Sequence, residues 1–214
     1  RGYACCSRSF GFGLMARSAA VTVPATSANL GPGYDSLGLA LELRDHVKAT
    51  LTDLPGVVVT VEGQGAGVLP ADETHLVATT IIEAGRTFGV EVTGLEVICQ
   101  NAIPQGRGLG SSAAAIVAGL VLARELSGTS ADEETLLRMA TAIEGHPDNV
   151  AACLLGAMTI AWTESDGLPN AVSMNAHPDI FPLAAVPNLE LSTKKARGLI
   201  PAQIPHEDAA FNVA

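Results

Sequence analysis

The chain has 214 residues, of which 48% are apolar and only 4% aromatic, so any core must be built mainly from Ala, Val, Leu and Ile. Its 22 acidic and 12 basic residues give a formal net charge of −10, which disfavours nucleic acid and anionic membrane surfaces as partners. The longest apolar runs, 113–123 and 150–162, are too short to span a bilayer. We therefore expect a soluble, cytoplasmic protein with buried free thiols, because its four cysteines show no metal-ligand spacing.

The first sixteen residues differ from the rest of the chain. They lack acidic residues, are rich in Gly and Ser, and do not begin with Met. Such a composition is compatible with an organellar transit peptide, but also with upstream sequence before a natural start at Met15. We favour the second interpretation and treat residues 1–16 as a non-native or leader segment.

From Ala19 onward the pattern predicts a mixed arrangement of strands and helices. The first part predicts strands at 20–24, 37–43, 47–51 and 57–61, a helix at 74–88 and a strand at 95–98. Helices at 111–126 and 131–144 follow, the second opened by a capping box at 130–133, and then a strand at 157–162. Beyond Asp166 the pattern thins, so we expect one domain over 17–168 and the start of another over 169–214.

A turn-rich motif at residues 24–35 follows the first predicted strand. Gly31, Pro32 and Gly33 predict a tight turn that could present Asn29 and Asp35 to one cavity. An amide and a carboxylate suit a ligand that carries ammonium and hydroxyl groups. The same two side chains could instead satisfy backbone amides within the turn.

The strongest local feature is a glycine-rich loop before the helix at 111–126. Gly106, Gly108 and Gly110 would let the backbone approach an anion closely, and Ser111 and Ser112 then open a helix whose free amides favour phosphate. The loop has neither the Walker A pattern nor the dinucleotide-binding spacing. A plain strand-to-helix turn with a serine cap is the alternative.

Two further polar clusters occur later in the chain. Residues 144–149 place two carboxylates, an imidazole and an amide at a helix end, although a structural turn around Pro147 would explain them as well. They lack the spacing of a zinc site. Residues 191–197 form a basic cluster, which composition alone would assign to a solvated surface.

These motifs resemble the GHMP kinase family of small-molecule kinases. Residues 104–114 match its nucleotide-binding signature P-x-x-x-G-L-G-S-S-A-A at every fixed position. The resemblance implies an α+β GHMP kinase fold of two domains, with a mixed sheet packed against helices. It also implies that Ser112 reaches Mg²⁺ and that ATP phosphates are wrapped by Pro104, Gln105, Gly106, Arg107, Gly108, Leu109, Gly110, Ser111, Ser112, Ala113 and Ala114.

Within that family the chain is most similar to the homoserine kinases. Residues 24–35 resemble their P-A-T-S-A-N-L-G-P-G-F-D motif with Tyr34 in place of Phe, residues 144–149 resemble their E-G-H-P-D-N run, and 193–197 their T-x-x-A-R segment. The implied site has Mg²⁺ held by Ser112 and Glu144, and L-homoserine held by Asn29, Asp35, His146, Asp148, Thr193 and Arg197. Asp148 would accept the hydroxyl proton while Asn149 orients that hydroxyl.

The resemblance implies transfer of the ATP γ-phosphoryl group to L-homoserine, a step in threonine biosynthesis, and leaves a homodimer open. The family's G-x-x-x-G-S-G-P-T motif has no counterpart in this sequence. We therefore expect a C-terminally truncated kinase with an incomplete second domain. The alternatives are a GHMP kinase for another small alcohol and an inactive nucleotide-binding fragment.

Overall fold

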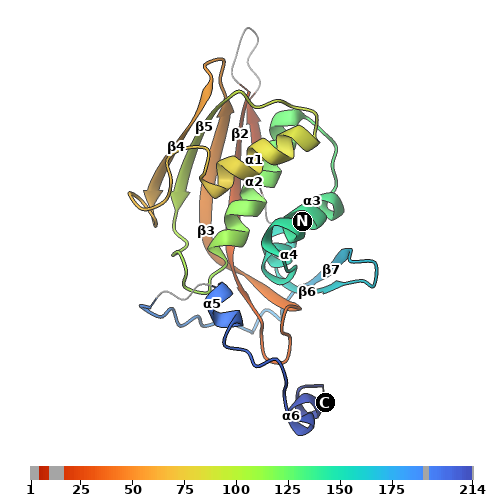
Figure 1. Ribbon diagram of the computed structural model, residues 1–214. Helices are drawn as coiled ribbons and strands as arrows, with labels where there is room; N and C mark the ends of the chain where they lie inside the picture. Colours follow the sequence, from red (N-terminus) through yellow and green to blue (C-terminus); the bar gives the residue numbers. More distant parts are fainter. Residues whose placement is uncertain (1–4, 10–16, 190–192, 214) are drawn as a thin grey trace.

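The computed structural model describes residues 5–9, 17–189 and 193–213 (Figure 1). Its centre is a seven-stranded mixed sheet in the order β1-β2-β3-β5-β4, with β6 on β3 and β7 on β6. Among the strand pairs of the described residues, only β4–β5 is parallel. The strands are β1 (Cys5–Ser9), β2 (Ser18–Ala28), β3 (Leu37–Leu51), β4 (Gly56–Gly63), β5 (Gly94–Asn101), β6 (Met158–Thr163) and β7 (Pro169–Met174). The helices are α1 (Leu76–Thr87), α2 (Ser111–Ser127), α3 (Glu133–Glu144), α4 (Asp148–Leu155), α5 (Thr193–Arg197) and α6 (His206–Val213).

The helices α1 and α2 cover one face of the sheet (Figure 1). Most of α2 is buried, and its small residues allow close packing: a Cβ on Gly119 would lie 2.6 Å from the Cβ of Thr80 in α1. The inner face of the sheet contributes alternate buried residues such as Val21, Val47 and Val97. The predicted mixed sheet packed against helices is confirmed, as is a core of small aliphatic residues.

Strand β3 corrects the prediction of two short strands at 37–43 and 47–51. It is continuous and pairs with β2 along most of its length, with a register shift between Pro24 and Thr26. On its other edge, β6 pairs with residues 37–39 and β5 with residues 46–51. The polar residues near Arg44 lie between these two partners, so they interrupt the hydrophobic pattern without ending the strand.

The start of α3 and the presence of α4 also differ from the prediction. The N-cap of α3 is Asp132, whose side chain accepts a hydrogen bond from Thr135 N at 2.9 Å, so the predicted box at 130–133 was wrong. Helix α4 was not predicted because its residues from Val150 to Leu154 are all buried and show no amphipathic period.

The hairpin β6–β7 joins the two sides of the expected domain boundary, since Thr163 pairs with Pro169. The sheet therefore ends at Met174. Beyond it, Figure 1 shows α5 against the lower end of the domain and α6 apart from it. The described part of this segment exposes large apolar side chains: Ile180, Phe181, Leu183, Leu189, Leu199, Ile200, Ile204 and Phe211. The division at 168/169 stays a prediction.

The structure also bears on the cysteines, the first sixteen residues and the apolar runs. Cys99 and Cys153 are buried and free, and burial raises the pKa of Cys99 to about 12 and that of Cys153 further. Of the predicted leader segment, residues 5–9 form β1, and the other residues lie outside the described ranges. None of the helices in the described ranges is long and apolar enough to cross a membrane.

Candidate active site

The glycine-rich loop has the backbone conformation that its sequence suggests. Gly106, Gly108 and Gly110 all have positive φ angles, of 65°, 74° and 67°. Gly110 is the N-cap of α2, and a Cβ there would lie 1.9 Å from Thr26 Oγ1. Only glycine therefore fits at the N-cap of α2 without displacing the Thr26 side chain of β2. The first backbone amides of α2 follow directly after this position.

The loop is held by β2 and by a buried carboxylate of β3. Thr26 N donates to Leu109 O at 3.0 Å, and Thr26 Oγ1 donates to Asn149 Oδ1 at 2.8 Å. Asp45 Oδ1 accepts from Ala102 N at 2.7 Å and Ile103 N at 2.8 Å, at the point where β5 leads into the loop. Sequence reasoning missed both anchors: Thr26 lies in the motif at residues 24–35 but was not assigned a role, and Asp45 belongs to no local motif.

A cavity of about 500 Å³ opens beside the loop. Its walls combine residues from all four predicted motifs with Pro187 and Leu189 from the segment after Met174. The lining residues are Ala28, Asn29, Gly106, Arg107, Gly108, Gly110, Ser111, Ser112, Glu144, His146, Asn149, Pro187, Leu189 and Ala196.

The loop between β2 and β3 folds around Asn29. Asn29 and Asp35 are both in the left-handed region, with φ of 58° and 54°. Asn29 Oδ1 accepts from Asp35 N at 2.9 Å, and Asn29 Nδ2 donates to Asp148 Oδ2 at 3.0 Å. Asn29 thus satisfies a local amide and also connects this loop to the start of α4, which combines the two alternatives of the sequence analysis.

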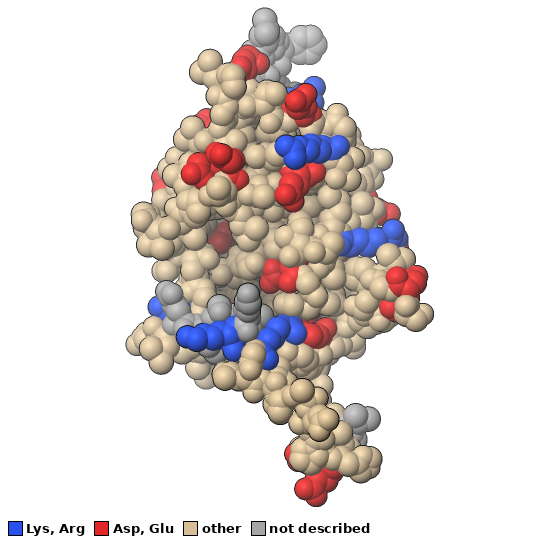
Figure 2. Space-filling model, viewed as in Figure 1, with Lys and Arg blue, Asp and Glu red and all other residues tan. Residues whose placement is uncertain are grey.

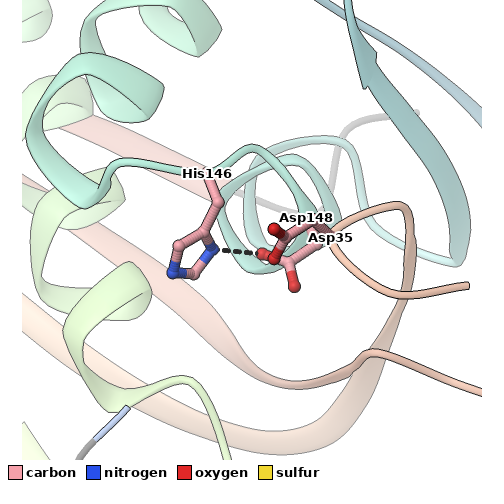
Figure 3. Close-up of side chains that lie close together, drawn as sticks. All are labelled: Asp35, His146 and Asp148. Atoms are coloured by element: carbon pink, nitrogen blue, oxygen red, sulfur yellow. Dashed lines mark hydrogen bonds and ion pairs between the residues drawn. The ribbon is translucent and has the colours of Figure 1, made fainter. Parts of the chain in front are cut away.

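Asp35, His146 and Asp148 converge at this place (Figure 3), with ligating atoms within 4.8 Å of one another. His146 Nδ1 and Asp148 Oδ1 are 2.5 Å apart, and Asn149 N donates to the same oxygen at 2.7 Å. Asp148 is completely buried, and its two oxygens receive hydrogen bonds from three groups. The cluster is more suited to a ligand's cationic group than to a dedicated metal ion, because Asp148 is already engaged.

The hydrogen bonds around Asp148 favour the charged forms of both His146 and Asp148. Burial raises the pKa of Asp148, but the hydrogen bonds from His146 and Asn149 N outweigh it, so its pKa is lowered. The hydrogen bond to Asp148 raises the pKa of His146 against the opposing effect of burial. Both shifts favour an imidazolium–carboxylate pair.

Ser112 and Glu144 meet on the other side of the cavity. Ser112 Oγ donates to Glu144 Oε2 at 2.8 Å. Burial raises the pKa of Glu144, and the hydrogen bond from Ser112 partly offsets it. A hydroxyl and a carboxylate oxygen beside a phosphate-type loop are donors that fit Mg²⁺.

Arg197 of α5 contacts the loop between β2 and β3. Its guanidinium forms a bidentate pair with Asp35, and Nη1 also donates to Tyr34 Oη at 3.0 Å. The hydrogen bond to Asp35 raises the pKa of Arg197. The side chain of Thr193 lies outside what the structure describes. Figure 2 shows Lys and Arg side chains gathered at the level of α5, on an otherwise acidic molecule.

Not all of the predicted nucleotide residues face the cavity. Leu109 and Ala113 are buried in the core, where they pack the loop and α2 against the sheet. Gln105 and Ala114 line a second cavity of about 240 Å³, which shares Ser111 and Ser112 with the loop. Sequence reasoning missed this second cavity, because its walls come from segments that are distant in the chain.

Comparisons with known proteins agree with this geometry. A family profile described as GHMP kinases N terminal domain matches residues 75–157. A homoserine kinase of Clavibacter michiganensis subsp. michiganensis is 51% identical over 200 residues, covering 92% of this chain and 63% of the relative. One of Streptomyces coelicolor is 51% identical over 195 residues, covering 90% and 62%. This chain thus spans less than two thirds of the length of these curated relatives.

A solved structure shows the same fold. The crystal structure of homoserine kinase from Cytophaga hutchinsonii matches with a TM-score of 0.76 and 33% identity, over 96% of this chain and 67% of that one. A D-glycero-D-manno-heptose 1-phosphate kinase shares the fold at a TM-score of 0.58 and 17% identity. With the glycine-rich loop, the cavity beside it and these matches together, the chain belongs to the homoserine kinases of the GHMP kinase family.

Proposed function

We propose that this chain is the nucleotide-binding part of an ATP-dependent homoserine kinase. The enzyme transfers the γ-phosphoryl group of ATP to the side-chain hydroxyl of L-homoserine and forms O-phospho-L-homoserine for threonine biosynthesis. The observation that carries the proposal is the single cavity of about 500 Å³ lined both by the glycine-rich loop and by Asn29, His146 and Asn149. A phosphate donor and a polar acceptor molecule can therefore meet there.

The loop supplies the phosphate-binding half of the site. Its glycines leave the backbone amides uncovered, and the N-terminus of α2 adds a positive dipole end. The second cavity, with apolar walls and a shared border at Ser111 and Ser112, suits the base of the same nucleotide. Such a loop needs no net positive charge on the protein, so it is compatible with the acidic composition.

Ser112 and Glu144 are the residues that would hold Mg²⁺. When bound, the ion neutralises charge on the ATP phosphates. The chain's own contribution is to keep the hydroxyl and the carboxylate together, as their hydrogen bond already does.

The substrate half suits an amino acid. In the structure Asp35 and Arg197 neutralise one another. An incoming zwitterion can replace both halves of this pair, with its ammonium on Asp35 and its carboxylate on the Arg197 guanidinium. Simple alcohols and sugars lack these two charges and cannot compensate for separating the pair.

In the transfer step a bond forms between the homoserine hydroxyl oxygen and the γ-phosphorus as the bond to ADP breaks, and the hydroxyl proton is released to solvent water. Asn149 uses its Oδ1 to accept from Thr26, which leaves its Nδ2 to orient the hydroxyl or the phosphoryl oxygens. Asp148 has a lowered pKa and three donors, so it is a poor proton acceptor. We assign it chiefly to holding Asn29 and His146 in place.

A coupled assay of ADP formation tests the proposal. The purified chain and a full-length homologue are each supplied with Mg-ATP and with homoserine, serine, mevalonate or galactose. Turnover should be confined to homoserine, with at most slow phosphorylation of serine. Turnover of mevalonate or galactose instead would establish a different GHMP kinase, and ATP binding without turnover by this chain alone would identify an inactive fragment.

The remaining parts of the proposal concern setting and assembly. Free, buried Cys99 and Cys153 fit a reducing cytoplasm. A homodimer is proposed by analogy with the family alone, and light scattering would measure it directly.

A further inference from the structure

Tyr34 directly precedes Asp35 in the loop between β2 and β3, and it has no part in the proposed transfer step. Its side chain is 50% exposed, so packing in the core does not account for its position. The Tyr34 hydroxyl accepts a hydrogen bond from Arg197 Nη1 at 3.0 Å, and Arg197 Cζ lies over the Tyr34 ring, 5.2 Å from its centroid. Tyr34 therefore contacts Arg197 in two ways, through its ring face and through its hydroxyl.

The loop is better anchored than the helix that carries Arg197. Gly33 O accepts a hydrogen bond from Leu37 N at 2.9 Å, and Asp35 N donates to Asn29 Oδ1 at 2.9 Å, so hydrogen bonds hold the backbone on both sides of Tyr34. Helix α5 has only five residues and follows a segment whose large apolar side chains are mostly exposed. The loop therefore positions α5, and not the reverse.

The guanidinium divides its donors between Tyr34 and Asp35. Nη1 and Nη2 each carry two hydrogens, and the bidentate pair with Asp35 uses one hydrogen of each. The second hydrogen of Nη1 remains for Tyr34. A ligand carboxylate that replaces Asp35 takes over the two hydrogens that Asp35 used and leaves the contacts of Tyr34 intact. Tyr34 can thus hold Arg197 while the anionic partner of Arg197 changes.

We propose that Tyr34 is a positioning residue for the substrate carboxylate, because its hydroxyl and ring keep the Arg197 guanidinium in orientation while Asp35 exchanges Arg197 for the substrate ammonium. The inference rests on the proposed function, since it needs an amino acid that separates the pair of Asp35 and Arg197. It adds a residue that touches no substrate atom but increases the affinity for ligands with a carboxylate. The homoserine kinase motif has Phe at this position, so the hydroxyl contact is a property of this chain and not of the motif.

Two substitutions separate the hydroxyl from the ring. Tyr34→Phe removes the hydrogen bond alone, and Tyr34→Leu removes the ring contact as well. NMR titration measures the dissociation constants of L-homoserine and of homoserinol, in which a CH₂OH group replaces the carboxylate, for the unsubstituted protein and both variants. Tyr34→Phe is also combined with Arg197→Ala. Thermal unfolding checks that each variant is folded, as the exposure of Tyr34 leads us to expect.

We expect Tyr34→Phe to weaken L-homoserine binding about two- to fivefold and Tyr34→Leu about five- to twentyfold, the usual effects of one hydrogen bond and of an added cation–π contact. The loss arises in the bound state, because Asp35 still holds Arg197 in the free protein. Homoserinol should bind the three proteins equally, since it places no carboxylate on Arg197. In the Arg197→Ala background, Tyr34→Phe should change neither affinity.

Three outcomes overturn the inference. Equal L-homoserine affinities in the three proteins would mean that the carboxylate orients Arg197 without help from Tyr34. Equal losses for L-homoserine and homoserinol would mean that Tyr34 only shapes the loop. The proposed function stands in both of these cases. If the unsubstituted protein does not bind L-homoserine, the assigned substrate is wrong, and the role of Tyr34 fails with it.

Discussion

At the scale of single residues, the site depends on close contacts that leave no space for an added side-chain atom. Gly110 is the clearest case, because its missing side chain leaves space for the hydrogen bond between Thr26 and Asn149. That bond connects β2 to α4 beneath the phosphate-type loop. The glycine therefore serves the backbone conformation of the loop and also the position of Asn149.

Substituting Gly110 with Ala should destabilise the protein by about 2–4 kcal/mol, as the sum of a left-handed backbone penalty and local overpacking. Gly108→Ala is the matched control, since its φ is also positive but nothing lies within 4 Å of the added Cβ. It should cost only about 1–2 kcal/mol. Urea unfolding of both variants measures the difference, and equal losses would mean that Thr26 can move aside freely.

The pair of His146 and Asp148 should make stability depend on pH. Because Asp148 raises the pKa of His146 above its ordinary value of 6.5, the pair's contribution is fully present below pH 6.5 and is lost as the pH rises through the folded-state pKa. It is also lost in acid, once the pH falls through the lowered pKa of Asp148. His146→Gln should therefore reduce the free energy of unfolding at pH 6 and matter progressively less at higher pH. A pH-independent difference in urea titrations would contradict this.

What the sequence could predict at this scale followed from local motifs. Gly106, Gly108 and Gly110 were found because they are close in the chain and act through their own backbone. Asp45 was not, because its surroundings are made by tertiary contacts. Arg197 was assigned to the substrate by resemblance, and only the structure shows that its guanidinium is paired with Asp35 in the unliganded chain.

At the scale of elements, helix starts were less predictable than helix existence. Ser130 and Asp132 are both good cap residues, and the sequence contains a box-like spacing that favours Ser130. The structure begins the helix at Glu133, with Asp132 accepting from Thr135 N. For strand β3, the prediction broke one element into two. Its polar centre suggested a break, but in the structure the strand continues there and only its neighbour changes, from β6 to β5.

The cap assignment gives a direct test. Asp132→Ala should remove the hydrogen bond to Thr135 N and lower Tm by about 2–4 °C, the usual effect of a lost helix cap in a protein of this size. Ser130→Ala should leave Tm nearly unchanged. Thermal unfolding followed by circular dichroism compares the two, and a larger effect at Ser130 would restore the original capping box.

At the scale of the whole molecule, the sequence could predict that a mixed sheet is covered by helices. It could not predict which strands are neighbours in the sheet. The local pattern predicted strands within β2 and β5, but nothing local specifies that β4 pairs in parallel with β5 or that β6 returns to β3. The sequence pattern thins beyond Asp166, and in the described part of the segment after Met174 the large apolar side chains are mostly exposed.

Polar contacts between the described part of this segment and the rest of the domain include Arg107 Nη1 to Pro187 O at 2.7 Å and the pair of Arg197 with Asp35. Arg197→Ala should therefore loosen it without affecting the core. The side chains of this ion pair are 34% and 36% exposed, and such a pair contributes at most about 1 kcal/mol. Cleavage by a dilute protease after Met174 should therefore accelerate up to about fivefold while Tm stays the same.

Arg138→Ala is the control, because it removes another surface ion pair, with Glu134 inside α3, far from this segment in the chain. It should leave the cleavage rate unchanged. Homoserine should slow cleavage of the unsubstituted chain, since its charges would bind Asp35 and Arg197 together, but should not slow cleavage of Arg197→Ala. If both variants are cleaved at the rate of the unsubstituted chain, Arg197 does not hold α5 in place, and the proposed exchange of partners at the substrate site loses its structural basis.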